Sequence, residues 1–495
     1  MAEQTKLLVG LEIHVQLQTK SKLFCNCSNE SFNAEPNVNI CPICLGHPGT
    51  LPVPNRKAIE YILLAGLTFG SEIPRTSKFD RKNYFYPDLA KGYQISQFDQ
   101  PFCEGGEIEV VAPDSKTIRL QRIHLEEDAG KLVHPTGADY SLVDFNRAGT
   151  PLIEIVTEPD IHSVDEAVAL AKKIQETCRY LGISKADMEK GHMRFDMNIN
   201  FVKGDERLTE ITEVKNLNSF RSLAKSIEFE TVRHQEAIEA GERLVHETRG
   251  WDDDNEVTLE QRSKEDAPDY RYFPEPDIPT IKISQDLINK ISRMIPEMPE
   301  DKARRFKEEY GLSAEDIAII VSDKKTAEFF EDSVSECFEW AVSIEGKDSE
   351  EESGKKKIVK MISNWLQSEL FGLMKADKKM IEDIKINPEN FAELIAMIYE
   401  KRINSSAGQT ILREMYRTGG DPSQIMSEKS LEQVNDSSEL EQICDEVMAE
   451  HPDETQKVRE GNKGTLQFLM GQVMKKTGGS ANPQTAMEIL QRKIG

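Results

Sequence analysis

The stretch that decides the fold lies near the start of the chain and reads Gly10-Leu11-Glu12-Ile13-His14-Val15-Gln16-Leu17. Its apolar and polar residues alternate, and alternating side chains along an extended strand point to opposite faces of a sheet. We therefore expect a β-strand with its apolar face on a core and with Glu12 and His14 on the other face. A carboxylate beside an imidazole makes half of a divalent-metal site. The alternative is a strand face that is polar only because it is exposed to solvent.

Similar strand-like runs, separated by loops rich in Gly, Pro, Asn and Asp, continue to about residue 276. Two stretches have helical apolar spacing instead, at residues 164–181, followed by Gly182, and at residues 219–240, followed by Gly241. A sheet interrupted by a few helices is typical of the α+β class. We therefore predict a large N-terminal cradle domain with a mixed sheet at residues 1–293.

The remaining sequence is helical in character and rich in Glu, Lys and Leu. We expect two all-helical domains there, at residues 294–386 and 387–495. Residues 346–357 form a charged, low-complexity run within the first of them. Such a run has little apolar surface to bury, so we predict a disordered loop.

The chain has 495 residues and a net charge of −25, which argues against non-specific nucleic-acid binding but allows a local basic patch. Its apolar runs are far shorter than the roughly 20 residues that span a bilayer, and it starts without a signal-peptide pattern. Only eight residues are cysteines, which fits a reducing compartment. We therefore expect a cytoplasmic protein with no membrane partner.

Four of the cysteines lie within twenty residues, as Cys25-x-Cys27 and Cys41-x-x-Cys44. Paired thiolates at this spacing are typical of a structural Zn²⁺ site, which has no open position for a substrate. The alternative is a chance cluster of reduced cysteines. We predict a zinc knuckle at these four residues.

Three further segments, at residues 122–130, 193–201 and 210–218, carry carboxylates on predicted strands. If these strands neighbour the one that holds His14, their carboxylates converge on one cavity, and such a cluster is tolerable only if it holds cations. Hard oxygen ligands with one imidazole suit Mg²⁺ or Mn²⁺. The carboxylates concerned are Glu12, Glu127, Asp196 and Glu213.

Residues 77–88 mix cations with aromatic side chains. Arg81 and Lys82 are candidates for contacts with the phosphates of a nucleotide, while an exposed loop anchored by aromatic core residues is the alternative. The chain contains neither a Walker loop nor a Rossmann fingerprint, so a nucleotide would need an unconventional site.

Several motifs resemble the GatB family, the B subunits of the tRNA-dependent amidotransferases, and the resemblance runs from about residue 7 to the C-terminus. The matching segments are residues 9–17, 77–87, 93–101, 124–130, 146–154, 215–220, 269–277 and 471–483. The resemblance implies ATP-dependent phosphorylation of the side-chain carboxylate of Asp-tRNA(Asn) or Glu-tRNA(Gln). Amidation would follow, with ammonia from a glutaminase A subunit in a heterotrimer that also contains a C subunit. It also implies that the helical region holds the tRNA.

The same resemblance implies that five residues line the synthetase site, namely Glu12, His14, Glu127, Asp196 and Glu213. Of these, Glu12, His14, Glu127 and Glu213 would be Mg²⁺ ligands, and Glu126 would be a neighbour with no assigned role. Two other functions stay open on the residues alone. One is a non-catalytic, zinc-containing scaffold that binds tRNA, and the other is a Mg²⁺-dependent phosphotransferase acting on a small acid.

Overall fold

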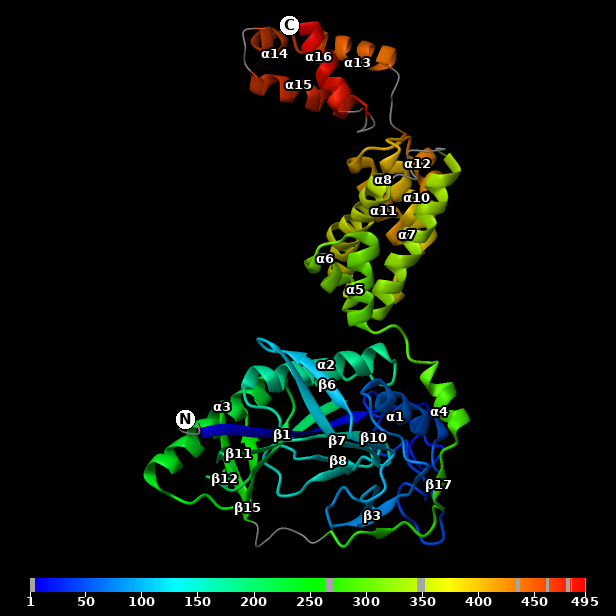
Figure 1. Cartoon of the computed structure of the whole chain (residues 1–495). Helices are drawn as coiled ribbons and strands as arrows, with labels where there is room; N and C mark the ends of the chain where they lie inside the picture. Colours follow the sequence, from blue (N-terminus) through cyan, green and yellow to red (C-terminus); the bar gives the residue numbers. More distant parts are fainter. Residues whose placement is uncertain are drawn as a thin grey trace. The chain divides into compact units, whose positions relative to one another are not determined.

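A computed structural model describes residues 5–263, 270–344, 352–432, 437–459, 463–477, 481 and 483–494. It divides into two compact units, Met1–Met298 and Pro299–Gly495 (Figure 1). Each unit is described by itself. Among the helices in these ranges, none combines the length and the apolar character that crossing a membrane requires.

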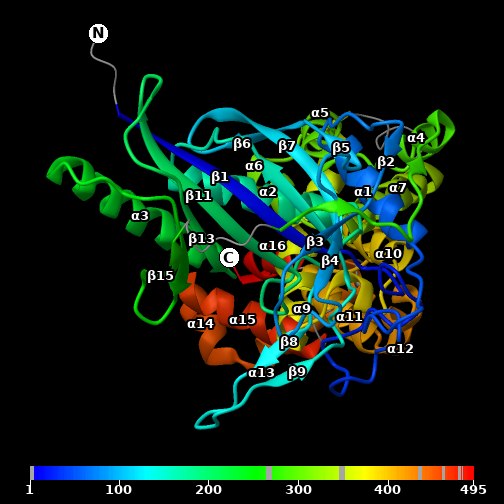
Figure 2. The ribbon, with the colours of Figure 1, turned by 90° about the horizontal axis from the view of Figure 1, so that it is seen from below.

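A ten-stranded sheet is the frame of the first unit, and its main path runs in the order β15-β14-β13-β11-β1-β10-β7-β5. Figure 2 shows β1 running along the sheet beside β11. Among the described strands of this sheet, β13 and β14 pair in parallel and the other pairs are antiparallel. The strands are β1 Thr5–Gln16, β5 Cys103–Glu104, β6 Glu107–Val111, β7 Ser115–Glu127, β10 Pro151–Thr157, β11 Met193–Lys203, β12 Glu206–Arg207, β13 Thr212–Leu217, β14 Glu247–Asp252 and β15 Val257–Ser263.

Three small sheets and four helices complete the part of this unit that the structure describes. The small sheets are β16-β3-β4 (Phe273–Pro274, Asp80–Asn83, Tyr93–Ser96), β17-β2 (Ile281–Lys282, Thr76–Ser77) and β8-β9 (Lys131–Val133, Leu142–Asp144). The helices are α1 Arg56–Thr68, α2 Val164–Tyr180, α3 Phe220–Ala240 and α4 Gln285–Ser292. The prediction of an α+β unit with a mixed sheet is therefore confirmed.

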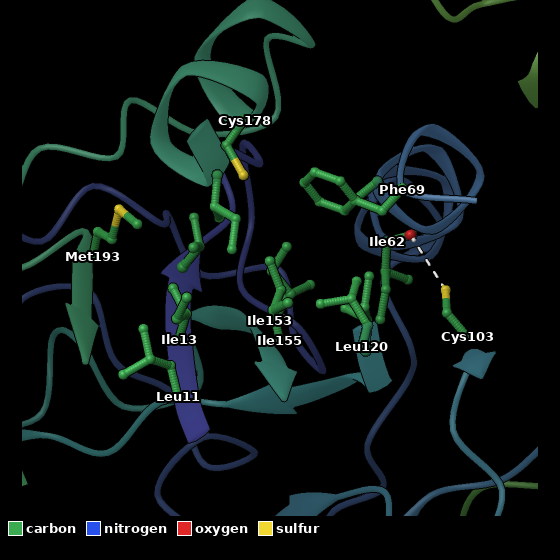
Figure 3. Close-up of a cluster of buried hydrophobic side chains, with 14 of the residues drawn as sticks. Leu11, Ile13, Ile62, Phe69, Cys103, Leu120, Ile153, Ile155, Cys178 and Met193 are labelled. Atoms are coloured by element: carbon green, nitrogen blue, oxygen red, sulfur yellow. Dashed lines mark hydrogen bonds between the residues drawn. The ribbon is translucent and has the colours of Figure 1, made fainter. Parts of the chain in front are cut away.

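The core of the first unit lies on the apolar face of the sheet (Figure 3). Leu11 and Ile13 on β1 are at most 1% exposed, and they lie beside Ile153 and Ile155 on β10. Cys178 of α2 reaches the same cluster from above the strands. The alternation of β1 therefore has the predicted effect, since its apolar residues are inside and its polar residues are on the other face.

The two predicted helices of this unit are confirmed, and both begin at a serine cap. Ser163 accepts a hydrogen bond from the amide of Glu166 at the start of α2, and Ser219 caps α3 in the same way. A capping side chain satisfies an amide that the helix itself leaves unpaired. Gly241 ends α3 with a φ of 67°, a conformation that favours glycine.

The regular elements described in the second unit are helices, as predicted. Its elements are α5 Pro299–Tyr310, α6 Ala314–Val321, α7 Lys324–Ile344, α8 Glu352–Asn364, η2 Trp365–Leu370, α9 Phe371–Asp377, η3 Ile381–Asp383, α10 Pro388–Tyr399, α11 Ser405–Thr418, α12 Pro422–Glu428, α13 Ser437–Glu450, α14 Pro452–Arg459, α15 Lys463–Lys476 and α16 Pro483–Ile494. Two apolar cores hold these helices. One includes residues from Phe306 to Leu431, and the other includes residues from Leu440 to Ile494.

The structure of this unit differs from two expectations drawn from the sequence. The expected division at residue 387 falls within the first helical core, because α10 packs against α7 and α8. The disordered loop expected at 346–357 is wrong for residues 352–357, which begin α8. They continue into a helix because Ile358, Val359 and Ile362 on the next turns are buried. Residues 346–351 lie outside the described residues.

Candidate active site

The register of the central strands sets polar residues side by side on the face opposite the core. His14 on β1 lies directly opposite Glu154 on β10 and opposite Arg194 on β11. Glu154 in turn lies opposite His124 on β7. Because paired residues of neighbouring strands point to the same face, four strands contribute to one row of ionisable side chains.

The centre of this row is a compact group of two histidines and two glutamates. One Glu154 oxygen lies 3.2 Å from His14 Nε2 and 3.1 Å from His124 Nε2. The Glu126 carboxylate lies 3.9 Å from His14 Nε2 and 3.7 Å from His124 Nε2. All four side chains are nearly buried, with at most 11% exposed. We call these four residues the central group.

The charges of the central group depend on one another. Burial alone would lower the pKa of His124, but the Glu154 carboxylate raises it to about 9. The pKa of His14 is raised for the same reason. Burial would raise the pKa of Glu154, yet the two imidazoles hold it well below its usual value. The imidazoles and the carboxylates of the central group therefore stabilise one another's charged forms.

The central group also has the donor set of a divalent-metal site. One ligand atom each from His14, Glu126 and Glu154 lies within 4.8 Å of the others. Two carboxylate oxygens and one imidazole nitrogen suit Mg²⁺ or Mn²⁺. An ion held by these three side chains has remaining positions for water or phosphate oxygens.

A second carboxylate group continues the polar face toward β13. Lys215 Nζ lies 2.7 Å from Glu213 Oε1 and 3.6 Å from Asp196 Oδ2. Glu12 lies opposite Asp196 and accepts a hydrogen bond from Asn198 Nδ2 at 3.2 Å. Burial, together with the charges of Glu154 and Asp196, raises the pKa of Glu12. In this second group, the single positive charge of Lys215 thus lies among the carboxylates of Glu12, Asp196 and Glu213.

Glu127 does not join either group. It follows Glu126 on β7, so its side chain leaves the other face of the strand. Its carboxylate pairs with Lys91 and accepts a hydrogen bond from the Ile95 amide at 2.9 Å. Asp128, the next residue, pairs with Arg194 through two contacts of 3.1 Å.

The four cysteines of the predicted knuckle do come together. Their sulfur atoms all lie within 4.8 Å of one another, so the cluster has the ligands and the size for a metal ion. Lys22 is fully buried beside them, with its Nζ 3.8 Å from Cys44 Sγ. A hydrogen bond with Cys25 lowers the pKa of Cys44 to about 4, and the Lys22 charge contributes. The site therefore favours a thiolate at Cys44.

Comparison with known proteins decides the family. Residues 7–289 match the family described as the GatB/GatE catalytic domain, and residues 350–494 match the family described as the GatB domain. The chain is 43% identical to the B subunit of the aspartyl/glutamyl-tRNA(Asn/Gln) amidotransferase of Myxococcus xanthus, over 99% of this chain and 98% of the relative. The chain belongs to the GatB family. Two more B subunits of the same name are similar to this chain. That of Persephonella marina is 44% identical over 98% of this chain and 99% of the relative, and that of Thermotoga maritima is 43% identical over 98% of each.

The two cations predicted to contact phosphates occupy different places in this member of the GatB family. Arg81 is bound to Glu275 at 2.6 Å and to Asp277 at 3.3 Å, and it stacks over the Tyr93 ring. Lys82 lies on the opposite side of the same strand, 4.9 Å from the centre of the Tyr270 ring. Burial would lower the pKa of Lys82, but the charges of Glu126 and Glu154 raise it. The negative charges of Glu126 and Glu154 therefore act on Lys82, whereas Arg81 is held by an ion pair.

Sequence reasoning missed two members of the central group of this GatB-family chain. His124 stands on the polar face of an alternating strand, so its face could be predicted but its partners could not. Glu154 gives no such signal, because every residue of β10 is buried. The signal that finds it is chemical, since a carboxylate within a run of apolar residues needs a charged partner.

Proposed function

We propose that this chain is the synthetase subunit of a tRNA-dependent amidotransferase and that the polar face of its large sheet is the reaction site. The substrate is the side-chain carboxylate of Asp-tRNA(Asn) or Glu-tRNA(Gln). A carboxylate oxygen attacks the γ-phosphorus of ATP, and ADP leaves. Ammonia then attacks the carbonyl carbon, inorganic phosphate leaves, and a proton is lost to give the amide. The product is Asn-tRNA(Asn) or Gln-tRNA(Gln), and the enzyme is a ligase.

The observation that supports this proposal is the central group, in which His14, Glu126 and Glu154 could hold a metal ion and His124 lies beside them. When a Mg²⁺ ion is bound, it neutralises charge on the phosphate oxygens of ATP. Lys82, whose charge interacts with those of Glu126 and Glu154, would hold a phosphate oxygen and orient it. Arg194, held by Asp128, adds a fixed positive charge next to His14.

Three further parts of the proposal concern the surroundings of this site. Ammonia comes from a glutaminase A subunit, because the sequence lacks a glutaminase motif of its own, and a C subunit completes the heterotrimer. The knuckle cysteines Cys25, Cys27, Cys41 and Cys44 hold a structural Zn²⁺. A cytoplasmic location accords with eight cysteines that form no disulfide.

Two adjacent residues offer a matched test of the metal assignment. Glu126→Gln removes a carboxylate of the central group, whereas Glu127→Gln removes one that pairs with Lys91. In the reconstituted heterotrimer, we expect Glu126→Gln to raise the Mg²⁺ concentration for half-maximal amidation by about 10–100-fold. We expect Glu127→Gln to leave this concentration within about twofold, whatever it does to the rate.

Mn²⁺ binding, followed by electron paramagnetic resonance, supplies a readout that does not depend on turnover. Equal losses of Mn²⁺ affinity in both variants would return Glu127 to the ligand set and overturn the assignment. Unchanged Mn²⁺ affinity in Glu126→Gln would show that the central group does not bind the metal. Assays of the wild-type heterotrimer with Asp-tRNA(Asn) and Glu-tRNA(Gln) separately decide which substrate it uses, and activity with neither refutes the proposed function.

A further inference from the structure

A cavity of about 430 Å³ lies where β1 ends and the chain turns toward the cysteine knuckle. Gln16 and the residues after it form one wall, and the segment that contains Phe32 forms another. The third wall comes from the turn before β11, with Lys185 and Lys190. A cavity of this size falls within the range of small-ligand sites.

The lining of this cavity is positively charged, which is unusual for a chain with a net charge of −25. Three of its residues are lysines, Lys20, Lys185 and Lys190, and only Glu30 contributes a carboxylate. Lys190 pairs with Asp187 at 3.1 Å. Within the part of the chain that the structure describes, neither Lys20 nor Lys185 has a carboxylate within 4.0 Å. Two ammonium groups are thus available to an anion.

The cavity also has an aromatic wall. Phe32 is 56% exposed, and Lys190 Nζ lies 5.6 Å from the centre of its ring. An exposed ring beside cations is the arrangement that single-stranded nucleic acids use, because a base stacks on the ring while phosphates contact the lysines. A free phosphate or a carboxylate ligand would not need the ring.

Gln16 connects this cavity to the proposed reaction site. It shares the strand face of His14 and lies two residues away, about 7 Å along the strand. Its side-chain amide donates to Asp128 at 2.9 Å, and Asp128 binds Arg194. A ligand in the cavity would therefore lie next to the central group.

We infer that this cavity, the lysine pocket (Lys20, Phe32, Lys185 and Lys190), binds the 3′-terminal nucleotides of the aminoacyl-tRNA. The inference rests on the proposed function. The reacting carboxylate belongs to an amino acid esterified to the terminal ribose, so the last nucleotides must lie close to the central group. Lys20 and Lys185 contact backbone phosphates, and a terminal base stacks on Phe32. The triphosphate of ATP is the other source of phosphate that a test must distinguish.

The test uses the reconstituted heterotrimer with a Lys20→Gln/Lys185→Gln double variant. The control is Lys131→Gln/Lys203→Gln, which removes the same charge from two exposed lysines outside the pocket. We expect the pocket variant to raise the KM for aminoacyl-tRNA about tenfold or more, with the KM for ATP within twofold. Loss of two single-strand phosphate contacts should lower the slope of log affinity against log salt by about 1.4.

A shortened RNA makes the test specific for the 3′ end. Removing the three terminal nucleotides should weaken binding to the wild type and the control, but it should weaken binding to the pocket variant much less, since that variant has already lost the contacts. Phe32→Ala should behave like the lysine variant, while Phe32→Tyr should keep wild-type affinity. Equal sensitivity to shortening in wild type and pocket variant would overturn the inference, as would a raised KM for ATP alone.

These outcomes stay separate from a failure of the proposed function. RNA affinity is measured by filter binding and does not require turnover, so the lysine pocket can fail while ATP-dependent amidation is intact. If the wild type forms no amide, the proposed function fails whatever the pocket variant binds.

Discussion

Replacing Lys22 by Met tests whether the cysteine knuckle holds a doubly charged metal ion. Lys22 is fully buried, and its Nζ donates hydrogen bonds to Cys44 Sγ at 3.8 Å and to the Phe145 carbonyl at 3.3 Å. Burying an ammonium without an anion costs several kcal/mol. The thiolates of the knuckle are the anions within reach, so Lys22 is a counter-charge for them. Met has nearly the same shape and no charge.

The magnitude follows from the charge of the loaded site. One Zn²⁺ with four thiolates carries a net charge of −2. The attraction between an ammonium and one thiolate at 3.8 Å is about 4 kcal/mol at an effective dielectric constant of about 20, before desolvation is subtracted. Changes next to metal ligands usually weaken binding by about 10–100-fold, which is about 1.4–2.7 kcal/mol. We expect Lys22→Met to raise the Kd for zinc within that range.

Zinc transfer to a colorimetric chelator measures this Kd, and thermal unfolding with and without chelator gives a second readout. The loss of stability should be larger with zinc than without it, because a metal-free Cys44 can take up a proton once Lys22 is gone. Lys20→Met is the control, since Lys20 is exposed and lies two residues away. A Kd within twofold of wild type in Lys22→Met refutes the counter-charge role, and so does an equal change in Lys20→Met.

Three other substitutions have signs that the structure fixes. Burial would raise the pKa of Glu230, but hydrogen bonds, that with His234 foremost, lower it to about 2. Its stabilising effect is therefore complete above about pH 4.5 and is lost as the pH falls toward 2, so Glu230→Gln should cost about 3 kcal/mol at pH 7 and almost nothing near pH 2 in urea unfolding. Gly66→Ala should destabilise by about 1–3 kcal/mol, because its Cβ would lie 2.3 Å from Cys103 Sγ. Gly372→Ala, whose new Cβ would lie within 4 Å of nothing beyond its chain neighbours and the backbone of its own helix, should instead stabilise by about 0.5–1 kcal/mol in thermal unfolding.

Alternation along single strands could be predicted from the sequence because it depends only on the local pattern. The apolar residues of β1 and β11 are buried as expected, and Glu12, His14, Asp196 and Glu213 lie on one face. Strand order is a different matter, since it depends on contacts between distant segments. The sequence therefore did not reveal that β10 lies between β1 and β7, which is what brings Glu154 against both histidines.

The helical unit illustrates the same limit at larger scale. Helical spacing identifies which face of α10 is apolar, but it does not say which helices that face meets. α10 packs into the core that contains Phe306 and Phe330, so a division placed before it separates helices that share one core. Composition likewise misled at residues 352–357, because charged residues can begin a helix whose later turns, such as that of Ile362, are buried.

Which carboxylate of β7 faces His14 is set by the apolar core. Side chains alternate along a strand, so a slip of one residue between β7 and β10 would exchange Glu126 for Glu127 at the central group. The same slip would bring Ile123 and Leu125, both fully buried, to the polar face. The slip would also move His124 and Glu126 into the apolar core, where burying a charge costs free energy, and Glu127 would lose its pairing with Lys91. The apolar core on the opposite face of the sheet therefore fixes which glutamate of β7 lies at the proposed metal site.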